Sequence, residues 1–411
     1  MQIFTTLERE EWNVREVVIV GAARTPFGRY GGTLMPFKAV DLGAIAIKEA
    51  INRAGIKPEQ VDYVYYGQVV QAGCGQVTSR QAAIKAGIPV ETPSITVNKV
   101  CSSGIITCAL AYRMIQAGII DVAVGGGMES MSNIPFGLFD MRWGARMGIP
   151  HKNCTDLMVW DGLWCAFYNR HMAIHGSEVA REFGLDREPQ DHWAVRSQNR
   201  AEEAIKAGRL KDEIVPVTIP GKKPVVMEND EQPRFGCTYD DIAKLPPVFD
   251  PQGSITAGNA PGVNDGASAL VLMAKEKADE LGIKPLATVL GYAEVSQEPR
   301  YIATVPGLSI KKLLDEKGMS IKDIDLIEIN EAFAAVALTS GKAILGLTDE
   351  ELDDKVNVNG GAIAFGHPIG ASGGRILMTL AYELKRRGGG LGVCGICSGA
   401  AQGDAMMIKV E

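Results

Sequence analysis

An internal repeat constrains the fold of this chain more than any other feature of its sequence. Residues 46–64 and 309–327 both carry the pattern of an amphipathic helix, a glycine and then an apolar strand. Residues 109–118 and 379–388 correspond in the same order and at nearly the same separation. Any two amphipathic helices look alike, but two ordered matches weaken that explanation. The repeat therefore predicts two homologous halves.

Strand patterns alternate with helix patterns in the first half. Residues 17–20 form an apolar run typical of a buried strand, 41–54 have a helix pattern, and 61–66 form the next strand pattern. Gly55 is placed to end the helix in the left-handed conformation that glycine adopts at low cost. This alternation predicts an α/β fold with mainly parallel strand pairing.

One long segment, residues 133–261, has no counterpart in the second half. It holds four of the five tryptophans and four of the five histidines. Insertions on a rigid scaffold commonly carry substrate recognition. We therefore predict an N-terminal extension at 1–15, a first half formed by 16–132 and 262–285, an inserted loop domain at 133–261, and a second half at 286–411.

The composition excludes several classes of protein. Hydrophobic residues are 46% and charged residues 22% of the chain, which indicates a folded globular protein. The net charge of −7 argues against nucleic acid as a partner, because that partner calls for a basic face. No apolar run approaches the ~20 residues of a membrane span. Eight irregularly spaced cysteines and an acidic start without a signal-peptide core predict a cytoplasmic protein without a disulfide framework.

Cys101 stands between a strand pattern that ends near Val100 and a helix pattern at 105–112. This places the cysteine at a helix N-terminus, where unpaired N–H groups and the helix dipole favour an anion. We therefore expect a lowered thiol pKa and a nucleophilic Cys101. The alternative is a small buried cysteine that only packs.

Three glycine-rich loops of the second half each follow a strand pattern and carry Asn330, His367 and Cys397. Ligands of open α/β sheets bind at the carboxyl ends of strands, so these side chains could converge with Cys101. Other interpretations stay open: Asn330 as a helix N-cap, His367 as an ordinary loop histidine, and Cys394 with Cys397 as a redox or metal pair.

Four motifs in order carry a family resemblance. They are Asn-x-Val-Cys-Ser-Ser-Gly at 98–104, Asn-Glu-Ala-Phe at 330–333, Gly-His-Pro-x-Gly at 366–370 and Cys-Ser-Gly-x-x-Gln-Gly at 397–403. Together they resemble the thiolases, the acetyl-CoA acyltransferases, over roughly residues 15 to 411. The resemblance implies an α/β fold of two βαβαβαββ halves in a five-layer αβαβα arrangement, with a loop domain inserted in the first half.

The resemblance also implies catalytic roles. Cys101 would be the acylated nucleophile, and His367 the base that activates it. Cys397 would be a second acid and base for the CoA thiol or the acetyl methyl group. Asn330, through a water and together with His367, would hold the enolate or thioester oxygen. The backbone N–H groups of Cys101 and Gly399 would form a second oxyanion hole.

Residues around the CoA substrate are carried over in the same way. These are Leu163, His171, Met172, Phe249, Ala257, Gly258, Pro261, Ala332 and Phe333. For Leu163, Met172 and Phe249 the alternative is ordinary core packing. The resemblance implies CoA as a substrate, no permanently bound cofactor and no metal. It also implies a homodimer or homotetramer, and it leaves open a need for an auxiliary subunit.

Several positions depart from the family pattern. Pro261 replaces a serine that meets the pantetheine, Ala303 and Val305 replace glycines near the acyl pocket, and Ala400 and Ala401 replace two more glycines. We therefore expect thiolysis of a 3-oxoacyl-CoA other than acetoacetyl-CoA, or the reverse Claisen condensation, in a β-oxidation-type pathway. Branched and aromatic acyl groups are among the candidates.

The alternatives are an acetoacetyl-CoA thiolase and a thiolase subunit that needs a partner chain. A decarboxylating ketosynthase of the same fold is a further alternative. Asn330 and Cys397 argue against it, because those enzymes have a histidine at the first position and lack the second cysteine.

Overall fold

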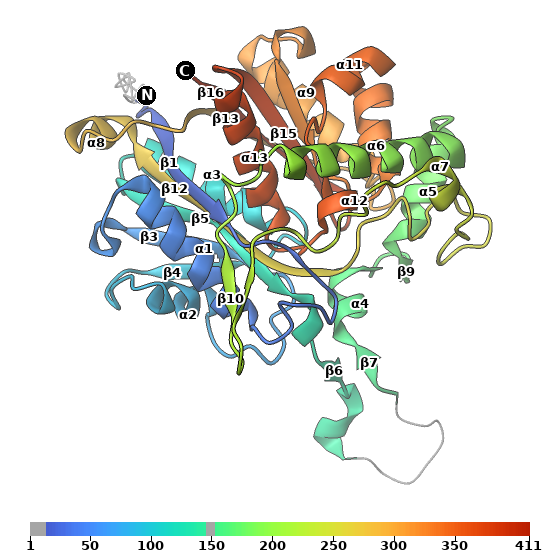
Figure 1. The fold of residues 1–411 in the computed structure, drawn as a ribbon, viewed down its shortest axis with the longest axis horizontal. Coiled ribbons are helices and arrows are strands. Elements are labelled where there is room, and N and C mark those ends of the chain that lie inside the picture. The colour runs from blue at the N-terminus through green and yellow to red at the C-terminus, as the bar shows by residue number, and fades with distance from the viewer. Residues whose placement is uncertain (1–13, 145–152) are drawn as a thin grey trace, which may run out of the picture.

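A computed structural model of the protein describes residues 14–144 and 153–411, and one ten-stranded sheet runs through it (Figure 1). The strands of this sheet are β1 (Val17–Arg24), β2 (Gly28–Arg29), β3 (Tyr63–Gly67), β4 (Ser94–Val97), β5 (Val122–Ser130), β12 (Asn264–Ala274), β13 (Ala287–Ser296), β14 (Leu326–Ile329), β15 (Gly390–Ser398) and β16 (Gln402–Val410). Their order is β14-β15-β16-β13-β1-β12-β5-β3-β4, and β2 pairs with β12.

The sheet shows the repeat directly. In the first half β3 runs parallel to β5, while β5 with β12 and β12 with β1 are antiparallel. In the second half β14 runs parallel to β15, while β15 with β16 and β16 with β13 are antiparallel. The halves join where β1 pairs with β13. The prediction of two homologous halves is confirmed.

The expectation of mainly parallel pairing is wrong. Antiparallel pairs join most neighbours in the sheet, because each half ends in a strand that returns beside its predecessor. The short turn at 399–401 between β15 and β16 allows only antiparallel pairing, whereas parallel strands need a crossover.

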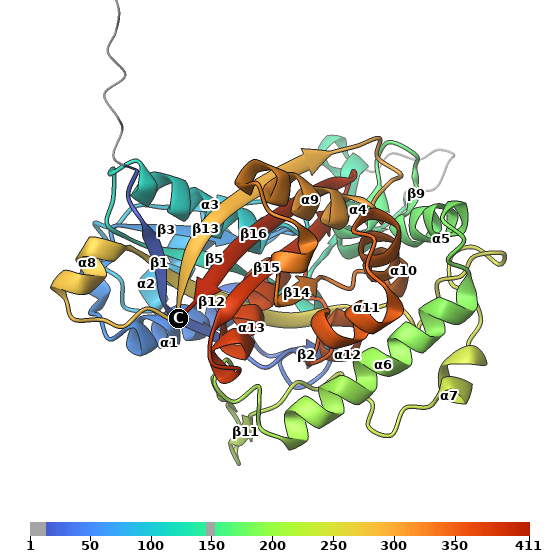
Figure 2. The ribbon, with the colours of Figure 1, turned by 90° about the horizontal axis from the view of Figure 1, so that it is seen from above.

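Helices cover both faces of the sheet and fill the space between its halves (Figure 2). Helix α1 (Ala39–Ala54) packs on β1 and β12, and α9 (Val305–Lys317) packs on β13 and β16. Helices α3 (Ser103–Gln116) and α13 (Ser372–Arg386) contact each other in the middle layer. Both α1 and α9 end at a glycine with positive φ, Gly55 at 69° and Gly318 at 64°.

The remaining elements lie mostly at the ends and sides of this scaffold. They are η1 (Pro58–Gln60), α2 (Thr78–Lys85), η2 (Met131–Asn133), β6 (Phe136–Gly137), η3 (Phe139–Trp143), β7 (Thr155–Asp156), α4 (Leu157–Gly162), β8 (Trp164–Cys165), β9 (Arg170–His171), α5 (Met172–Glu182), α6 (Arg187–Lys206), β10 (Val217–Ile219), β11 (Val225–Met227), α7 (Tyr239–Ala243), α8 (Lys275–Glu280), η4 (Ile321–Asp323), α10 (Ala334–Leu338), η5 (Thr339–Ile344), α11 (Asp349–Lys355) and α12 (Ala362–Phe365). Strands β6 and β7 lie on an arm that projects from the sheet (Figure 1).

Two predictions about the organisation of the chain remain predictions. The extension at 1–15 falls almost wholly outside the described residues, and the domain boundaries stay a prediction. Within the part of the chain that the structure covers, every helix is too short or too polar to cross a bilayer.

Candidate active site

Cys101 lies in a tightly held loop between β4 and α3. It precedes the N-cap residue of α3, and the residue before it, Val100, has a φ of 46°. A β-branched residue rarely adopts this left-handed conformation, so the surroundings must hold it there. Lys99 does so through its N–H, which donates to Ser103 Oγ at 2.9 Å, and through its carbonyl oxygen, which accepts from Ser398 Oγ at 2.6 Å.

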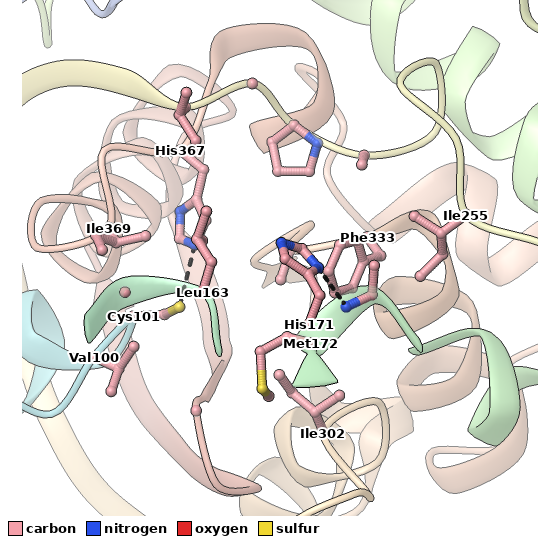
Figure 3. A pocket seen from close by; sticks show the side chains of 18 of the residues that line it. Val100, Cys101, Leu163, His171, Met172, Ile255, Ile302, Phe333, His367 and Ile369 are labelled. Atoms are coloured by element: carbon pink, nitrogen blue, oxygen red, sulfur yellow. Dashed lines mark hydrogen bonds between the residues drawn. The ribbon is translucent and has the colours of Figure 1, made fainter. Parts of the chain in front are cut away.

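His367 lies directly against the nucleophile, as Figure 3 shows. Its Nε2 is 3.3 Å from Cys101 Sγ, and its Nδ1 is 2.6 Å from Ser372 Oγ. The Ser372 hydroxyl donates its one hydrogen to the carbonyl of Pro368, so it accepts from Nδ1–H of the histidine. This assigns the proton of the neutral ring to Nδ1. Nε2 then carries a lone pair that can take the proton of the thiol.

The loop that carries His367 is fixed from two other elements. Asn264 at the start of β12 accepts the N–H of His367 at 2.9 Å. Glu129 on β5 accepts the N–H of Gly370 at 3.0 Å. These bonds hold the imidazole beside Cys101. The loops that follow the strands were predicted to bring these two residues together.

The expected lowering of the Cys101 pKa is wrong. Burial raises the pKa of Cys101 to about 12, although its own backbone N–H opposes this, and Glu129 adds to the rise. Burial lowers the pKa of His367 to about 3, with a smaller contribution from Arg375. The site therefore holds a neutral thiol and a neutral imidazole. Desolvation outweighs the helix dipole, because the thiol is removed from water.

An apolar cavity of about 180 Å³ opens onto this pair (Figure 3). Ten of the predicted site residues line it: Cys101, Leu163, His171, Met172, Phe249, Pro261, Ala332, Phe333, His367 and Gly399. Ala257 and Gly258 lie outside this lining. Val100, Met131, Ile255, Ile302 and Ile369 are among the further residues that line it. The cavity therefore brings residues of the 133–261 segment against residues of both halves.

His171 and Phe249 face each other at the wall of the cavity. Their rings stack with centroids 3.5 Å apart and planes at 8°. His171 Nδ1 accepts the N–H of Ala173, and burial lowers the pKa of His171 to about 4. The ring is therefore neutral at physiological pH and forms an uncharged wall.

Asn330 and Cys397 lie behind the cavity surface. Both are fully buried at the carboxyl ends of β14 and β15. The N-cap of the helix after Asn330 is Phe333, so the N-cap interpretation of Asn330 is wrong. Burial raises the pKa of Cys397 well above its usual value, and the electrostatic interaction with Cys101 adds to the rise. The two thiols are thus within electrostatic reach of each other.

The positions that depart from the family pattern differ in their relation to the cavity: Pro261 lines it, whereas Ala303 and Val305 do not. Ile302 lines the cavity, but Ala303 and Val305 pack behind it with Cys397 and Ala401. Their side chains therefore do not narrow the cavity themselves. Ala400 and Ala401 both have positive φ, at 62° and 50°. Alanine at such positions costs about 1–2 kcal/mol relative to glycine.

Sequence reasoning missed three residues that hold the site: Ser372, Asn264 and Glu129. Only Ser372 had a local signal, since a hydroxyl five residues after a histidine, at the start of a helix pattern, can reach back to the ring. Asn264 and Glu129 are distant in sequence from the loop that they hold. Their roles follow only from the assembled sheet.

Comparisons with known proteins decide the family. The models of the thiolase N-terminal domain and the thiolase C-terminal domain match residues 17–276 and 283–410. The chain belongs to the thiolase family. An acetyl-CoA acetyltransferase of Syntrophomonas wolfei is 50% identical over 96% of this chain and 99% of its own length. One from Cupriavidus necator is 48% identical over the same shares.

A solved thiolase structure agrees with the fold. The crystal structure of the Bacillus anthracis acetyl-CoA acetyltransferase matches with a TM-score of 0.92 at 40% identity, over 96% of this chain and 99% of that one. The predicted thiolase fold is confirmed, and this thiolase is an acyltransferase enzyme. Its eight cysteines are free thiols, and the described residues contain no group of three or more metal-ligating side chains.

Proposed function

We propose that this thiolase interconverts two molecules of acetyl-CoA with acetoacetyl-CoA and CoA, and that the acetyl group passes through Cys101. The observation that carries the proposal is the contact of Cys101 Sγ with His367 Nε2, 3.3 Å, on the wall of an apolar cavity. The named relatives, which are acetyl-CoA acetyltransferases, support the same reaction.

In thiolysis, Cys101 attacks the 3-oxo carbon of acetoacetyl-CoA while its proton passes to Nε2 of His367. The new oxyanion is held by the backbone N–H groups of Cys101 and Gly399. Such preorganised donors each lower the activation free energy by about 3 kcal/mol. The transfer begins from a neutral pair, so charge develops only as the S–C bond forms.

Collapse of this intermediate breaks the bond between C2 and C3. Acetyl-Cys101 forms, and the electron pair leaves on the enolate of acetyl-CoA, whose oxygen is held by Asn330 through a water and by protonated His367. Cys397 gives its proton to the enolate carbon, which releases acetyl-CoA. The raised pKa of Cys397 keeps the thiol protonated for this step.

The second half-reaction regenerates the enzyme. Cys397, now a thiolate, takes the proton of CoA, and the CoA sulfur attacks acetyl-Cys101. The Cys101 thiolate leaves and recovers its proton from His367. Splitting the reaction through an acyl-cysteine replaces one difficult step by two easier ones. Condensation of two acetyl-CoA molecules follows the same steps in reverse.

A short acyl group is favoured over the bulkier one expected from the sequence. Of the three positions on which the bulkier preference rested, Pro261 lines the cavity, whereas Ala303 and Val305 lie behind it. The relatives' names also support the acetoacetyl-CoA alternative. A place in β-oxidation stays a prediction.

The test is CoA-dependent loss of 3-oxoacyl-CoA across a panel of short, medium, branched and aromatic substrates. We expect acetoacetyl-CoA to have the highest kcat/KM. Preferences should be graded, because each methylene changes binding by only ~1–3 kcal/mol. A branched or aromatic member that exceeds acetoacetyl-CoA would contradict the proposal and restore the first expectation. If no member reacts until an extract of the native host is added, the auxiliary-subunit alternative gains support.

A further inference from the structure

Arg375 is buried beside the catalytic loops and takes no part in the steps proposed above. It lies on α13 and is 0% exposed. Its Nη1 donates to Glu328 Oε2 at 3.1 Å, and its Nη2 approaches Asn330 Oδ1 at 3.5 Å. Glu328 is also buried, on β14. A buried ion pair adds little stability compared with apolar residues of the same volume, so stability alone gives a weak reason for it.

The contact with Arg375 determines which way the Asn330 amide faces. A guanidinium has only hydrogen-bond donors, so it attracts the oxygen of an amide and repels its NH₂ group. At 3.5 Å the attraction is mainly between the cation and the amide dipole. Oδ1 therefore faces α13, and Nδ2 faces away from the guanidinium.

The Nδ2 group of Asn330 is left available for a ligand. It is fully buried and has no hydrogen-bond partner within the described part of the protein. Buried donors are nearly always paired, so a free one at a site calls for a ligand oxygen or a bound water. The reverse amide orientation would place NH₂ against the guanidinium and present only an acceptor to the site.

We propose that Arg375 is a positioning residue, which orients the Asn330 amide so that Nδ2 donates to a water that in turn donates to the enolate oxygen. This inference rests on the proposed function, because that function supplies the enolate. Arg375 also lies within electrostatic reach of His367, the second group that holds this oxygen. Arg375 on α13 therefore interacts with both groups that hold the enolate oxygen, Asn330 and His367.

The test separates the enolate step from acylation. Acylation of Cys101 by acetyl-CoA needs the N–H groups of Cys101 and Gly399, whereas exchange of the acetyl-CoA methyl protons with D₂O needs the enolate. The variant is the double change Arg375→Gln with Glu328→Gln, which removes both charges and leaves no unpaired buried carboxylate. We expect methyl exchange to fall at least about tenfold while the acylation rate stays within about threefold of wild type.

Three single variants serve as controls. Glu328→Gln keeps Arg375 beside Asn330 and should retain most of the exchange. Arg24→Gln removes another fully buried arginine, ion-paired to Glu213 at 2.7 Å and to Asp230 at 2.6 Å, and should lower stability without separating the two rates. Arg375→Lys keeps a cation beside Asn330 and should therefore retain more of the methyl exchange than the double variant does.

Unchanged exchange in the folded double variant would overturn the proposal, as would an equal loss of both rates. If the double variant does not fold, Arg375→Lys decides: exchange must fall more than acylation, and an equal effect on both contradicts the proposal. Failure of acetyl-CoA to acylate the wild-type protein would instead contradict the proposed function, and this role with it.

Discussion

At the scale of single residues, the tautomer of His367 depends on the hydroxyl of Ser372. Replacing Ser372 by alanine removes the acceptor of the Nδ1 proton, 2.6 Å away, and lets the ring rotate or change tautomer. Losing a buried hydrogen bond of this kind costs about 1–3 kcal/mol. We therefore expect Ser372→Ala to lower kcat for thiolysis by about 10- to 100-fold, measured with acetoacetyl-CoA and CoA.

Ser309→Ala is the matched control. Ser309 is equally buried, and its hydroxyl also donates to a carbonyl of its own segment, that of Pro306 at 2.9 Å. It lies on α9, away from the cavity lining. This variant should keep nearly full activity, and equal losses in the two variants would contradict the role given to Ser372.

The lowered pKa of His367 makes stability depend on pH. The folded protein binds this proton only near pH 3, whereas the unfolded chain binds it near the ordinary 6.5. The stabilisation is therefore complete above pH 6.5 and is lost as pH falls toward 3. The free energy of unfolding therefore falls by about 2 kcal/mol between pH 7 and pH 5 because of this residue. Measured by urea unfolding, the free energy of unfolding of His367→Gln should fall by about 2 kcal/mol less between pH 7 and pH 5 than that of the wild-type protein. An equal loss in the two proteins would show that burial does not depress this pKa.

The motifs identified the reacting residues but not their ionisation. Cys101 and His367 could be found because short local patterns surround each of them. The direction of the Cys101 pKa could not, because burial depends on residues from both halves and from the 133–261 segment that close over the thiol. Asn264 and Glu129 were missed for the same reason.

At the scale of elements, α3 and α13 approach closely at Gly104. A Cβ on Gly104 would lie 2.7 Å from the Gly374 nitrogen and 3.0 Å from the Gly370 carbonyl oxygen. These are backbone atoms, so the helices must move apart and shift the loop of His367. Overpacking of this kind costs about 1–3 kcal/mol. We expect Gly104→Ala to lower both the Tm and the thiolysis rate.

Gly341→Ala provides the comparison for this change. Its Cβ would come within 3 Å only of the Leu352 side chain, at 2.6 Å, and that side chain can rotate away. The rate should stay close to wild type. A Gly104→Ala protein with unchanged Tm and rate would show that the contact between α3 and α13 does not position His367.

Several elements followed from the sequence within a few residues. The pattern at 41–54 became α1, and the corresponding glycines ended α1 and α9. Strand direction was harder, because β12 and β16 pair antiparallel with strands distant along the chain or across a tight turn. A strand pattern records burial and carries no information on direction.

At the scale of the whole molecule, the edge strand of the sheet indicates that the protein forms an oligomer. Strand β4 is the last strand on its side, and Ile95 on it is 44% exposed. Unpaired apolar edges favour pairing with another chain. We expect at least a homodimer by light scattering at micromolar concentration, and Ile95→Lys should weaken it. A monomeric wild-type protein would contradict this expectation.

The central claim is that Cys101 carries the acyl group, with His367 as its base and Cys397 as the second thiol. The most direct measurement is incubation with acetyl-CoA, acid quenching and peptide mass spectrometry. We predict acetylation of the Cys101 peptide, its loss on addition of CoA, and its absence in Cys101→Ser, because a hydroxyl ionises far less readily. Cys397→Ala should still be acetylated on Cys101. Acetylation found on Cys397, or on neither cysteine, would contradict the claim.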